Sequence, residues 1–474
     1  MTTGRAAISA RRTEKVDAAT GVLLVLVAIV VTLDEWDLHG AFVLIPFLVT
    51  ALVALLAIRV RRSRQAFVLA ALVLTGVAVA ILPDWQTTVL RALGSAGFIA
   101  AFFAALTTLR NVAESSPSIR AAGMFLAEQP PGRRYAALTV GSHMFALLLN
   151  YGAISLLGNL ATTSAAQEPN AEIRSHRTRR MLLAIQRGFI SSLPWSPLGF
   201  SMAITNALIP GARWAASAPA GFVSAGIIIV AGWALDRIFK PKLSVPPPPR
   251  GPVEGSWALM RPLLLLLVLL GVTVSVLHTQ TGFRIVGIVM LVVPVLSLGW
   301  ALVQHRGGAL DYGMRDRLVR YVTQELPGTR GEVTLLMMAG YIGTVGGPLL
   351  GPVVAGAGID LAALPTWAVL VLLVWLVPFL GQLGMNPILA VTLFASIIPA
   401  PEVLGVSPSA LVAAIAAGWA ISGICSPFTA TTLLIGSFAG VSALHVGVRW
   451  NGAFVVIVGA LLSAWVVIYA FVIG

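Results

Sequence analysis

The chain has 474 residues, of which 58% are hydrophobic and only 10% are charged, and its mean hydropathy is +0.91. This composition excludes a soluble globular protein. The net charge of +13 does not indicate nucleic-acid binding, because the basic residues gather in short segments between apolar runs. The sequence therefore predicts an all-α polytopic membrane protein, with the lipid bilayer as a partner and no nucleic acid.

Four apolar runs open the chain, and each is long enough to cross a bilayer: 18–34, 40–58, 66–82 and 89–108. Arginines follow the second run, whereas acidic residues occupy the alternate loops. Lys and Arg favour the cytoplasmic side of a membrane. We therefore predict that the N-terminus lies inside.

The next apolar run, 136–163, conflicts with a simple crossing. A crossing would place the arginines between positions 174 and 180 outside, against the charge rule. We expect instead a re-entrant inner hairpin that turns near Asn150, since non-helical backbone is tolerated in a membrane where it lines a protein cavity. The alternative is a plain crossing, with the charge bias of other loops setting the orientation.

The run 181–213 contains Ser196-Pro197, and proline inside a helix removes an N–H and clashes with the preceding turn. We therefore predict a broken helix there, followed by a return span at 217–238. A proline-rich stretch at 240–257 is predicted to be a stiff cytoplasmic linker. This linker divides the chain into 1–239 and 258–474, which we predict to be two structural repeats.

The second half is predicted to contain spans at 258–277, 283–304 and 333–356, an outer re-entrant hairpin at 365–401, a broken helix at 408–440, and a last span at 450–473. The whole chain then has about 11 transmembrane helices plus two re-entrant hairpins, and its C-terminus lies outside. On this topology only Arg91, Arg213 and Arg284 of the 31 basic residues lie at the outer side. Such a bias supports the assignment.

Hairpins that enter from opposite sides predict two inverted repeats. One similarity does not fit this arrangement: the segment 128–134 resembles 325–330, and the topology places both on the cytoplasmic side. A parallel repeat is therefore the alternative for 305–360, with 333–356 as a cytoplasmic hairpin.

A short pattern occurs at both predicted breaks. Six of its fourteen positions match at a constant offset of 230: Ala184, Ile185, Gly188, Ser192, Ser196 and Pro197 are repeated as Ala414, Ile415, Gly418, Ser422, Ser426 and Pro427. Broken helices in corresponding positions of two halves indicate the binding site of a transporter. The alternative is that each Ser-Pro pair is a structural kink, because membrane helices tolerate proline.

The predicted binding site combines the hairpin tips with the breaks. Each half-helix N-terminus carries about half a positive unit charge and suits an anion, while hydroxyl, amide and carbonyl oxygens can hold sodium. The predicted substrate contacts are Asn150, Ser192, Ser196, Pro197, Gln382, Asn386, Pro387, Ser422, Ser426, Pro427 and Thr429. The candidate sodium ligands are Asn150, Ser196, Asn386 and Ser426.

His143 is the one histidine well within an apolar run, and it is a candidate for proton coupling because histidine titrates near neutral pH. A hydrogen-bonded core histidine is the alternative. The chain has a single cysteine and shows no zinc spacing, phosphate loop or nucleophile motif. We expect no metal site besides sodium, no cofactor besides Na⁺ or H⁺ as coupling ion, and no enzymatic activity.

The order hairpin, broken helix, hairpin, broken helix resembles the ion transporter superfamily, which includes divalent anion/sodium symporters, arsenite permeases and TRAP large membrane subunits. Asn150 and Asn386 match its hairpin-tip asparagines, and Ser196-Pro197 and Ser426-Pro427 match its unwound loops; the similarity covers 128–214 and 365–440. The resemblance implies an elevator-type movement against a dimeric scaffold. The Ser-Asn-Thr tip motif of the dicarboxylate carriers is missing, so sodium coupling and a dicarboxylate substrate do not carry over.

These features predict a secondary active transporter that moves a small anionic solute across the cytoplasmic membrane by alternating access, coupled to Na⁺ or H⁺. One alternative is the membrane subunit of a binding-protein-dependent, TRAP-type transporter. Another is a membrane enzyme or assembly component for a lipid-linked glycan. Such enzymes normally carry acidic or histidine catalytic groups in extramembrane loops, whereas the outer loops here are short and hold few acids.

Overall fold

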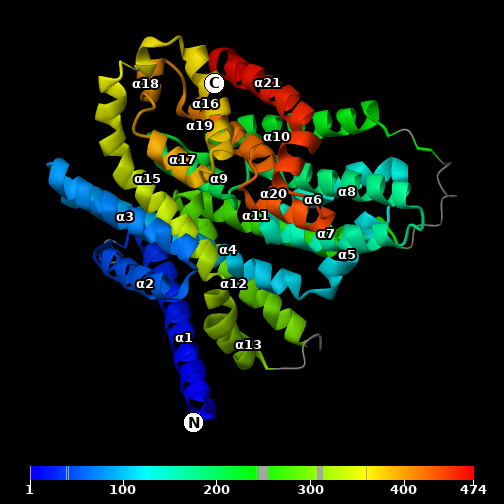
Figure 1. The fold of residues 1–474 in the computed structure, drawn as a ribbon, viewed down its shortest axis with the longest axis horizontal. Helices are drawn as coiled ribbons and strands as arrows, with labels where there is room; N and C mark the ends of the chain where they lie inside the picture. Colours follow the sequence, from blue (N-terminus) through cyan, green and yellow to red (C-terminus); the bar gives the residue numbers. More distant parts are fainter. Residues whose placement is uncertain are drawn as a thin grey trace. The chain divides into compact units, whose positions relative to one another are not determined.

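A computed structural model describes residues 2–38, 40, 42–241, 243–244, 255–306, 313–358 and 360–473, with side chains from residue 14 onward (Figure 1). Every regular element in these residues is a helix, which confirms the predicted all-α fold. The predicted linker at 240–257 lies mostly outside the described residues.

Ten helices in the described part of the chain are long and apolar enough to cross a membrane: Glu14–Glu35, Phe42–Arg59, Arg62–Ile81, Trp85–Glu114, Trp214–Ile238, Trp257–Thr281, Ile285–Arg306, Arg330–Gly356, Pro408–Ala439 and Gly452–Ile473. They correspond to ten of the eleven predicted crossings. The remaining one, 181–213, is divided into α8 (Ala171–Ser192) and α9 (Phe200–Leu208) around the first Ser-Pro pair. Large side chains such as Phe47 (70% exposed) and Leu265 (69% exposed) present an apolar surface that suits lipid. The chain is a multi-pass membrane protein.

The chain folds into two compact units, and each unit takes segments from both halves of the sequence. Unit 1 comprises Met1–Val112, Thr273–Ile359 and Thr392–Ile397, and unit 2 comprises Ala113–Val272, Asp360–Val391 and Ile398–Gly474. These units do not coincide with 1–239 and 258–474. The repeats, and the re-entrant character of the hairpins, remain predictions.

Unit 1 is built from long membrane-spanning helices and short connecting ones: α1 (Thr2–Glu35), η1 (Phe42–Leu44), α2 (Ile45–Arg59), α3 (Arg62–Ile81), α4 (Trp85–Glu114, to Val112), α11 (Arg261–Thr281, from Thr273), α12 (Ile285–Arg306), α13 (Met314–Arg320), η3 (Tyr321–Glu325), α14 (Leu326–Gly328) and α15 (Arg330–Gly356). Polar contacts join these apolar helices. Thr75 Oγ1 lies 2.8 Å from Tyr341 Oη between α3 and α15, and Thr108 donates to Ser297 at 3.1 Å between α4 and α12.

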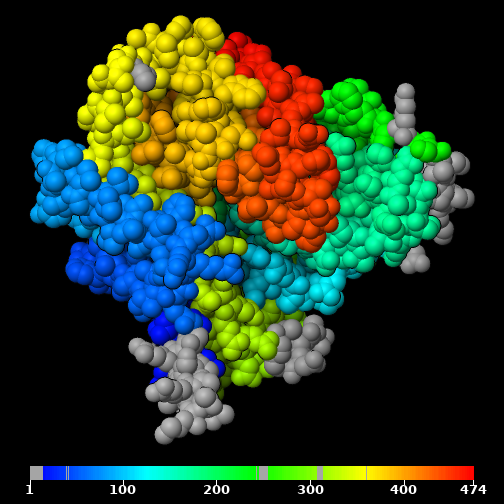
Figure 2. Space-filling model, viewed as in Figure 1, coloured from blue at the N-terminus to red at the C-terminus, as the bar shows by residue number. Residues whose placement is uncertain are grey.

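Unit 2 holds the first predicted hairpin, most of the second and both breaks. Its elements are α5 (Pro117–Ala127), α6 (Pro131–Leu149), α7 (Tyr151–Ala166), α8, α9, α10 (Trp214–Ile238), η2 (Trp257–Met260), α16 (Thr366–Gln382), α17 (Pro387–Phe394, to Val391), α18 (Pro401–Leu404), α19 (Pro408–Cys425), α20 (Ala430–Ala439), η5 (His445–Trp450), α21 (Gly452–Ile468) and η6 (Tyr469–Ile473). Helix α19 is almost entirely buried, whereas α20 lies at the surface of the unit, orange in Figure 2, where Leu433 is 53% exposed.

Candidate functional site

The first break separates α8 from α9, as the Ser-Pro pair predicts. The backbone N–H of Ser196 bonds to Ser192 O at 3.0 Å, which closes a turn directly after the end of α8. The Ser196 hydroxyl then accepts the N–H of Leu198 at 3.2 Å, and Gly199 N–H bonds to Ser196 O at 3.1 Å. Ser196 is therefore buried as the turn residue of an unwound stretch, and its hydroxyl holds that stretch in shape.

The second break, between α19 and α20, has the same bonds at the matching positions. The N–H of Ser426 bonds to Ser422 O at 3.0 Å, the Ser426 hydroxyl accepts the N–H of Phe428 at 3.2 Å, and Thr429 N–H bonds to Ser426 O at 3.4 Å. Residues separated by 230 positions thus make equivalent hydrogen bonds, so the sequence match corresponds to a structural match. Neither α9 nor α20 has a side-chain cap on the N–H groups of its first turn.

The matched glycines bring each broken helix against the first helix of the preceding hairpin. A Cβ at Gly188 would overlap Thr139 O of α6, and a Cβ at Gly418 would lie 2.8 Å from Leu373 O and Val374 O of α16. Helices approach this closely only where a side chain is missing. The pairs α6–α8 and α16–α19 are therefore equivalent (Figure 1).

The two breaks adjoin each other within unit 2. A Cβ at Gly423, three residues before Ser426, would lie 3.3 Å from Ile190 Cγ2 and 3.5 Å from Leu193 Cδ1. Leu193 itself stands three residues before Ser196. The structure therefore brings the ends of α8 and α19 together.

The second hairpin is joined directly to the second break. The Ser426 hydroxyl donates to Gly381 O at 2.6 Å, and Gln382 is hydrogen-bonded to the thiol of Cys425. Beyond them, Gly384 adopts φ +90° beside the ring of Phe428, a conformation that favours glycine. Gln382 is exposed, so this edge of the second break lies open.

Asn386 and Pro387 form the start of α17. Asn386 Oδ1 accepts the N–H of Ile388 at 2.8 Å, which is a local bond at the start of α17. Within the described residues, the Asn386 side chain makes no hydrogen bond to a residue of either break. Both residues are half-buried. The cap-and-proline start is as predicted from the sequence, and a contact between Asn386 and a solute remains a prediction.

The first hairpin turns at Asn150, which has φ +49° and ψ −130°. A positive φ is uncommon for a residue other than glycine, and such strained residues gather at functional sites. The Asn150 side chain makes no hydrogen bond in the described structure. The next residue, Tyr151, stacks on Phe189 at 5.2 Å, and Phe189 O accepts the hydroxyl of Ser192 at 2.7 Å. The hairpin tip therefore reaches the last turn of α8, and the hydrogen bonds given for Ser196 in the described residues do not involve the tip.

His143 lies against the first break. Its Nδ1 is 2.7 Å from the Ser191 hydroxyl, which itself donates to Gly188 O at 2.7 Å, so Nδ1 of His143 is the donor. The imidazole also stacks on Trp195, with ring centroids 5.6 Å apart. His143 is thus hydrogen-bonded, as the second of the two interpretations of this residue expects. It also lies beside the first break, so a role in proton coupling stays a proposal.

Buried hydroxyls without partners lie on the helices of both breaks. Thr432 donates to Ser426 O at 2.6 Å and Thr431 donates to Gly423 O, so these two are occupied. In contrast, Ser422, Ser201 and Thr205 are fully buried, and their hydroxyl oxygens have no hydrogen-bond partner in the described structure. Such groups in a native protein call for an explanation, for example a bound molecule.

Ser201 and Thr205 were missed by sequence reasoning. They are spaced i, i+4 and therefore share one face of α9, which packs on α19. The spacing of four positions could have indicated from the sequence that two hydroxyls lie on one helix face. The Nε1 of Trp195 is also buried without a partner, although its carbonyl accepts the indole N–H of Trp214 at 2.7 Å.

Replacing Ser426 by alanine is expected to lower the free energy of unfolding by about 1 kcal/mol, because it removes a buried hydrogen bond to Gly381 O. Ser422→Ala, four residues earlier, is expected to change it by less than about 0.5 kcal/mol, because the Ser422 hydroxyl has no partner to lose. Thermal unfolding of the two purified variants checks this order. Equal stability of both would show that the Ser426 bond contributes nothing.

The described residues contain no group of three or more His, Cys, Asp or Glu that could hold a metal ion. A sodium ion at the breaks would therefore depend on hydroxyl, amide and carbonyl oxygens, as proposed from the sequence.

The multi-pass helical fold of this chain, with helical hairpins and two adjoining broken helices in unit 2, resembles that of solved transporters. Two solved structures share it. One is the YdaH transporter of Alcanivorax borkumensis, with a TM-score of 0.55 and 16% identity over 86% of this chain and 98% of that chain. The other is MtrF of Neisseria gonorrhoeae, which represents a class of antimetabolite efflux pumps, with a TM-score of 0.58 and 15% identity over 89% of this chain and 97% of that chain. Both of these proteins are described as transporters or efflux pumps. Comparison with protein-family models and with curated protein sequences gives no match.

Proposed function

We propose that the protein is a secondary active transporter that moves a small anionic solute across the cytoplasmic membrane. The observation that carries the proposal is the pair of adjoining breaks, which have equivalent hydrogen bonds and each pack on the first helix of a hairpin. Broken helices of this kind form the substrate sites of many transporters. The fold shared with two transporters supports the same class.

The charge distribution supports an anionic solute. The segments 129–167, 181–235, 361–401 and 403–473, which include both hairpins and both breaks, contain no Asp or Glu. The first turns of α9 and α20 start at the breaks without side-chain caps, and their N–H groups carry partial positive charge. A negatively charged group is the ligand that such helix starts favour.

Unit 2 contains both breaks, which supports an elevator-type movement of a substrate-carrying body. This mechanism, the ion transporter superfamily and a homodimeric scaffold come from the resemblance of the sequence, and we keep them as parts of the proposal. Coupling to H⁺ would involve His143 beside the first break, and coupling to Na⁺ would involve oxygens of Ser196, Ser426, Asn150 and Asn386. The proposed orientation has the N-terminus inside and the C-terminus outside.

Two other transport functions are compatible with the same site. The first is the membrane subunit of a TRAP-type system, which would require a separate solute receptor for any flux. The second is export of antimetabolites, which the fold shared with MtrF suggests as a direction of transport. A membrane enzyme for a lipid-linked glycan is the weakest candidate, since both structural neighbours are transporters.

The test begins with thermal-shift screening of the purified chain against a panel of small carboxylates, inorganic anions and antimetabolites, with and without sodium. Each stabilising compound is then used, radiolabelled, for uptake into proteoliposomes. Ser196→Ala, Ser422→Ala, Ser426→Ala and Asn386→Ala are expected to lower uptake by about tenfold or more, because each removes a polar group that shapes or lines the proposed site, and a buried hydrogen bond is worth about 1–2 kcal/mol.

Ser437→Ala is the matched control, because the Ser437 hydroxyl is exposed on α20 and bonds within its own helix to Leu434 O. Its uptake should equal that of the unmodified protein. Unchanged uptake in all four site variants would reject a transport site at the breaks. Growth-linked loss of a glycan, with no flux of any solute, would favour the enzyme.

A further inference from the structure

A buried arginine lies in α8 without a carboxylate partner. Arg187 is only 5% exposed. Its Nη1 donates to Tyr135 Oη at 3.0 Å, and its Nε and Nη2 donate to Asn451 Oδ1 at 3.4 and 3.3 Å. The guanidinium carbon also lies 4.3 Å from the ring centre of Phe454. All of these partners are neutral, and an arginine keeps its charge in a protein, so a positive charge is buried there without compensation.

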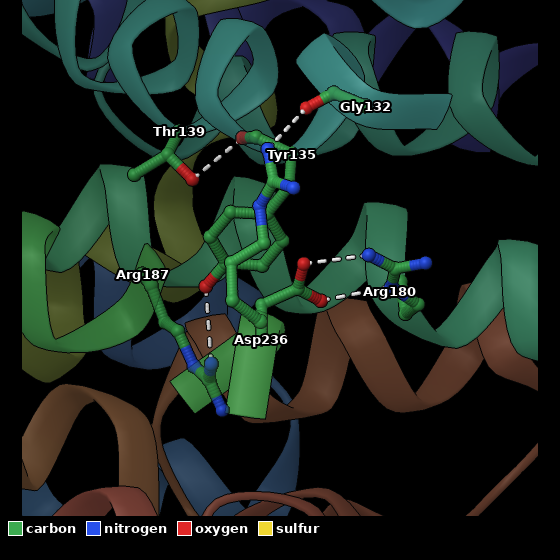
Figure 3. A network of polar contacts seen from close by, with 7 residues as sticks. Gly132, Tyr135, Thr139, Arg180, Arg187 and Asp236 are labelled. Carbon is green, nitrogen blue, oxygen red and sulfur yellow. Dashed lines mark hydrogen bonds and ion pairs between the residues drawn. The ribbon is translucent and has the colours of Figure 1, made fainter. Parts of the chain in front are cut away.

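The carboxylate of Asp236, drawn in the same network in Figure 3, is already occupied. Arg180 donates to both Asp236 oxygens, from Nε at 2.8 Å and from Nη2 at 2.6 Å. Figure 3 shows this pair, with Arg187 directed instead toward the hydroxyl of Tyr135. The charge of Asp236 is therefore matched by Arg180, and Arg187 remains the unbalanced cation.

An unpaired hydrogen-bond donor lies in the same cluster. Asn451 Nδ2 donates to Gln186 Oε1 at 3.0 Å and to Val446 O at 3.1 Å, which fixes the orientation of both amides. The Nε2 of Gln186 then has no partner in the described structure, although Gln186 is fully buried. Asn451 therefore contacts both residues: its Nδ2 donates to Gln186, which has an unpaired donor, and its Oδ1 accepts from Arg187, which has no carboxylate partner.

We propose that the Arg187 cluster, formed by Tyr135, Gln186, Arg187, Asn451 and Phe454, binds a small monovalent anion. The guanidinium of Arg187 and the amide N–H of Gln186 supply the donors, and a single negative charge balances the single buried positive one. Hydrogen bonds between an arginine and an anion are among the strongest in proteins. Chloride and the carboxylate of an organic solute present the same chemistry to these donors. The site is separate from the two breaks, so it does not depend on the proposed transport function.

The full chain, purified in detergent, is the material for the test. Its unfolding temperature is measured in the sodium salts of chloride, acetate and methanesulfonate at equal ionic strength, the last as a bulkier reference anion. We expect chloride or acetate to raise the unfolding temperature relative to methanesulfonate, because a ligand that binds only the folded state stabilises it. A rise in chloride assigns the site to an inorganic anion, and a rise confined to acetate assigns it to an organic carboxylate. No rise in either salt would overturn the proposal.

Gln186→Glu is the decisive variant, because it places a permanent negative charge in the cluster and leaves an oxygen for Asn451 Nδ2. It should raise the unfolding temperature in methanesulfonate and abolish the further rise in chloride or acetate. Gln167→Glu, an exposed change in the same unit, is the matched control and should keep the full anion effect. An equal anion effect in both variants, or a lower stability of Gln186→Glu in methanesulfonate, would contradict an anion at Arg187.

Arg187→Gln removes the positive charge and Arg187→Lys removes the forked shape of the guanidinium; because the site needs both, each variant should lose most of the broadening of the ³⁵Cl resonance that chloride binding causes. Ser196→Ala and Ser426→Ala should retain the anion effect in full. This outcome distinguishes failure of the anion site from failure of the transport site.

Discussion

Gly188→Ala is expected to lower the free energy of unfolding by about 3 kcal/mol, at the upper end of the usual cost of overpacking a core. A Cβ at this position would overlap the backbone oxygen of Thr139 and lie 2.9 Å from Ser142 Cβ. A backbone oxygen cannot rotate away as a side chain can, so α6 and α8 would have to separate. Their separation would also lengthen the 2.7 Å hydrogen bond from the Ser142 hydroxyl to Ile185 O.

Thermal unfolding of the purified variant in detergent measures this loss. Gly226→Ala in α10 is the matched control, because nothing lies within 4 Å of a Cβ built there and alanine favours a helix over glycine by up to about 1 kcal/mol. Gly418→Ala should fall between them, since its Cβ would lie 2.8 Å from two carbonyl oxygens of α16. If Gly188→Ala were as stable as Gly226→Ala, the close packing of α6 on α8 would be wrong.

Asp236→Asn is expected to lower the free energy of unfolding by about 3 kcal/mol, the usual result of removing one partner of a buried ion pair. The side chain of Asp236 is only 7% exposed and that of Arg180 is 29% exposed. Arginines crowd the same region. Burial, together with the nearby Arg177 and Arg180, lowers the pKa of Arg134 to about 10. Without the carboxylate, the half-buried Arg180 would stay among like charges.

Asparagine has nearly the size of aspartate, so the change tests charge and not packing. Asp360→Asn is the control: Asp360 is exposed, and its Oδ1 accepts the N–H of Ala362 at 2.9 Å, a bond that an asparagine oxygen can also accept. Chemical unfolding of both variants gives the comparison. If Asp236→Asn lowered the free energy of unfolding by less than about 0.5 kcal/mol, the Arg180–Asp236 pair would contribute no more than an ordinary surface ion pair, against the prediction.

The positions of the breaks could be predicted from sequence because proline acts locally. Ser196-Pro197 lies in the unwound stretch between α8 and α9, Ser426-Pro427 directly follows α19, and Pro387 is the first residue of α17. The all-α fold followed in the same way from length and composition. Matching residues at a constant spacing also indicated that the two breaks would have equivalent geometry.

Properties that depend on distant residues could not be read in this way. Arg187 follows closely after the arginines at 174–180. The charge rule therefore gave no reason to expect that Arg187 is buried while those arginines lie at the cytoplasmic side. Its burial depends on Asn451, which is 264 positions away in the sequence. The unpaired hydroxyls of Ser201 and Thr205 likewise become visible only when α9 is packed on α19.

The compact units were equally hidden from the sequence. Similarity between segments reports repetition, whereas a compact unit depends on which helices contact one another in three dimensions. Unit 2 combines 113–272 with 360–391 and 398–474, so hairpins and breaks from both halves belong to one body. The division at the proline-rich linker, 240–257, was predicted for structural repeats, which compact units do not test.

The hydroxyls of Ser196 and Ser426 each accept an N–H two residues ahead, at 3.2 Å in both cases, so each unwound stretch is supported from within. A site built in this way is preorganised. An incoming solute would not have to freeze a flexible loop, and little binding free energy would be lost to ordering the backbone. Affinity at the breaks would then reflect mainly the exchange of water for direct contacts.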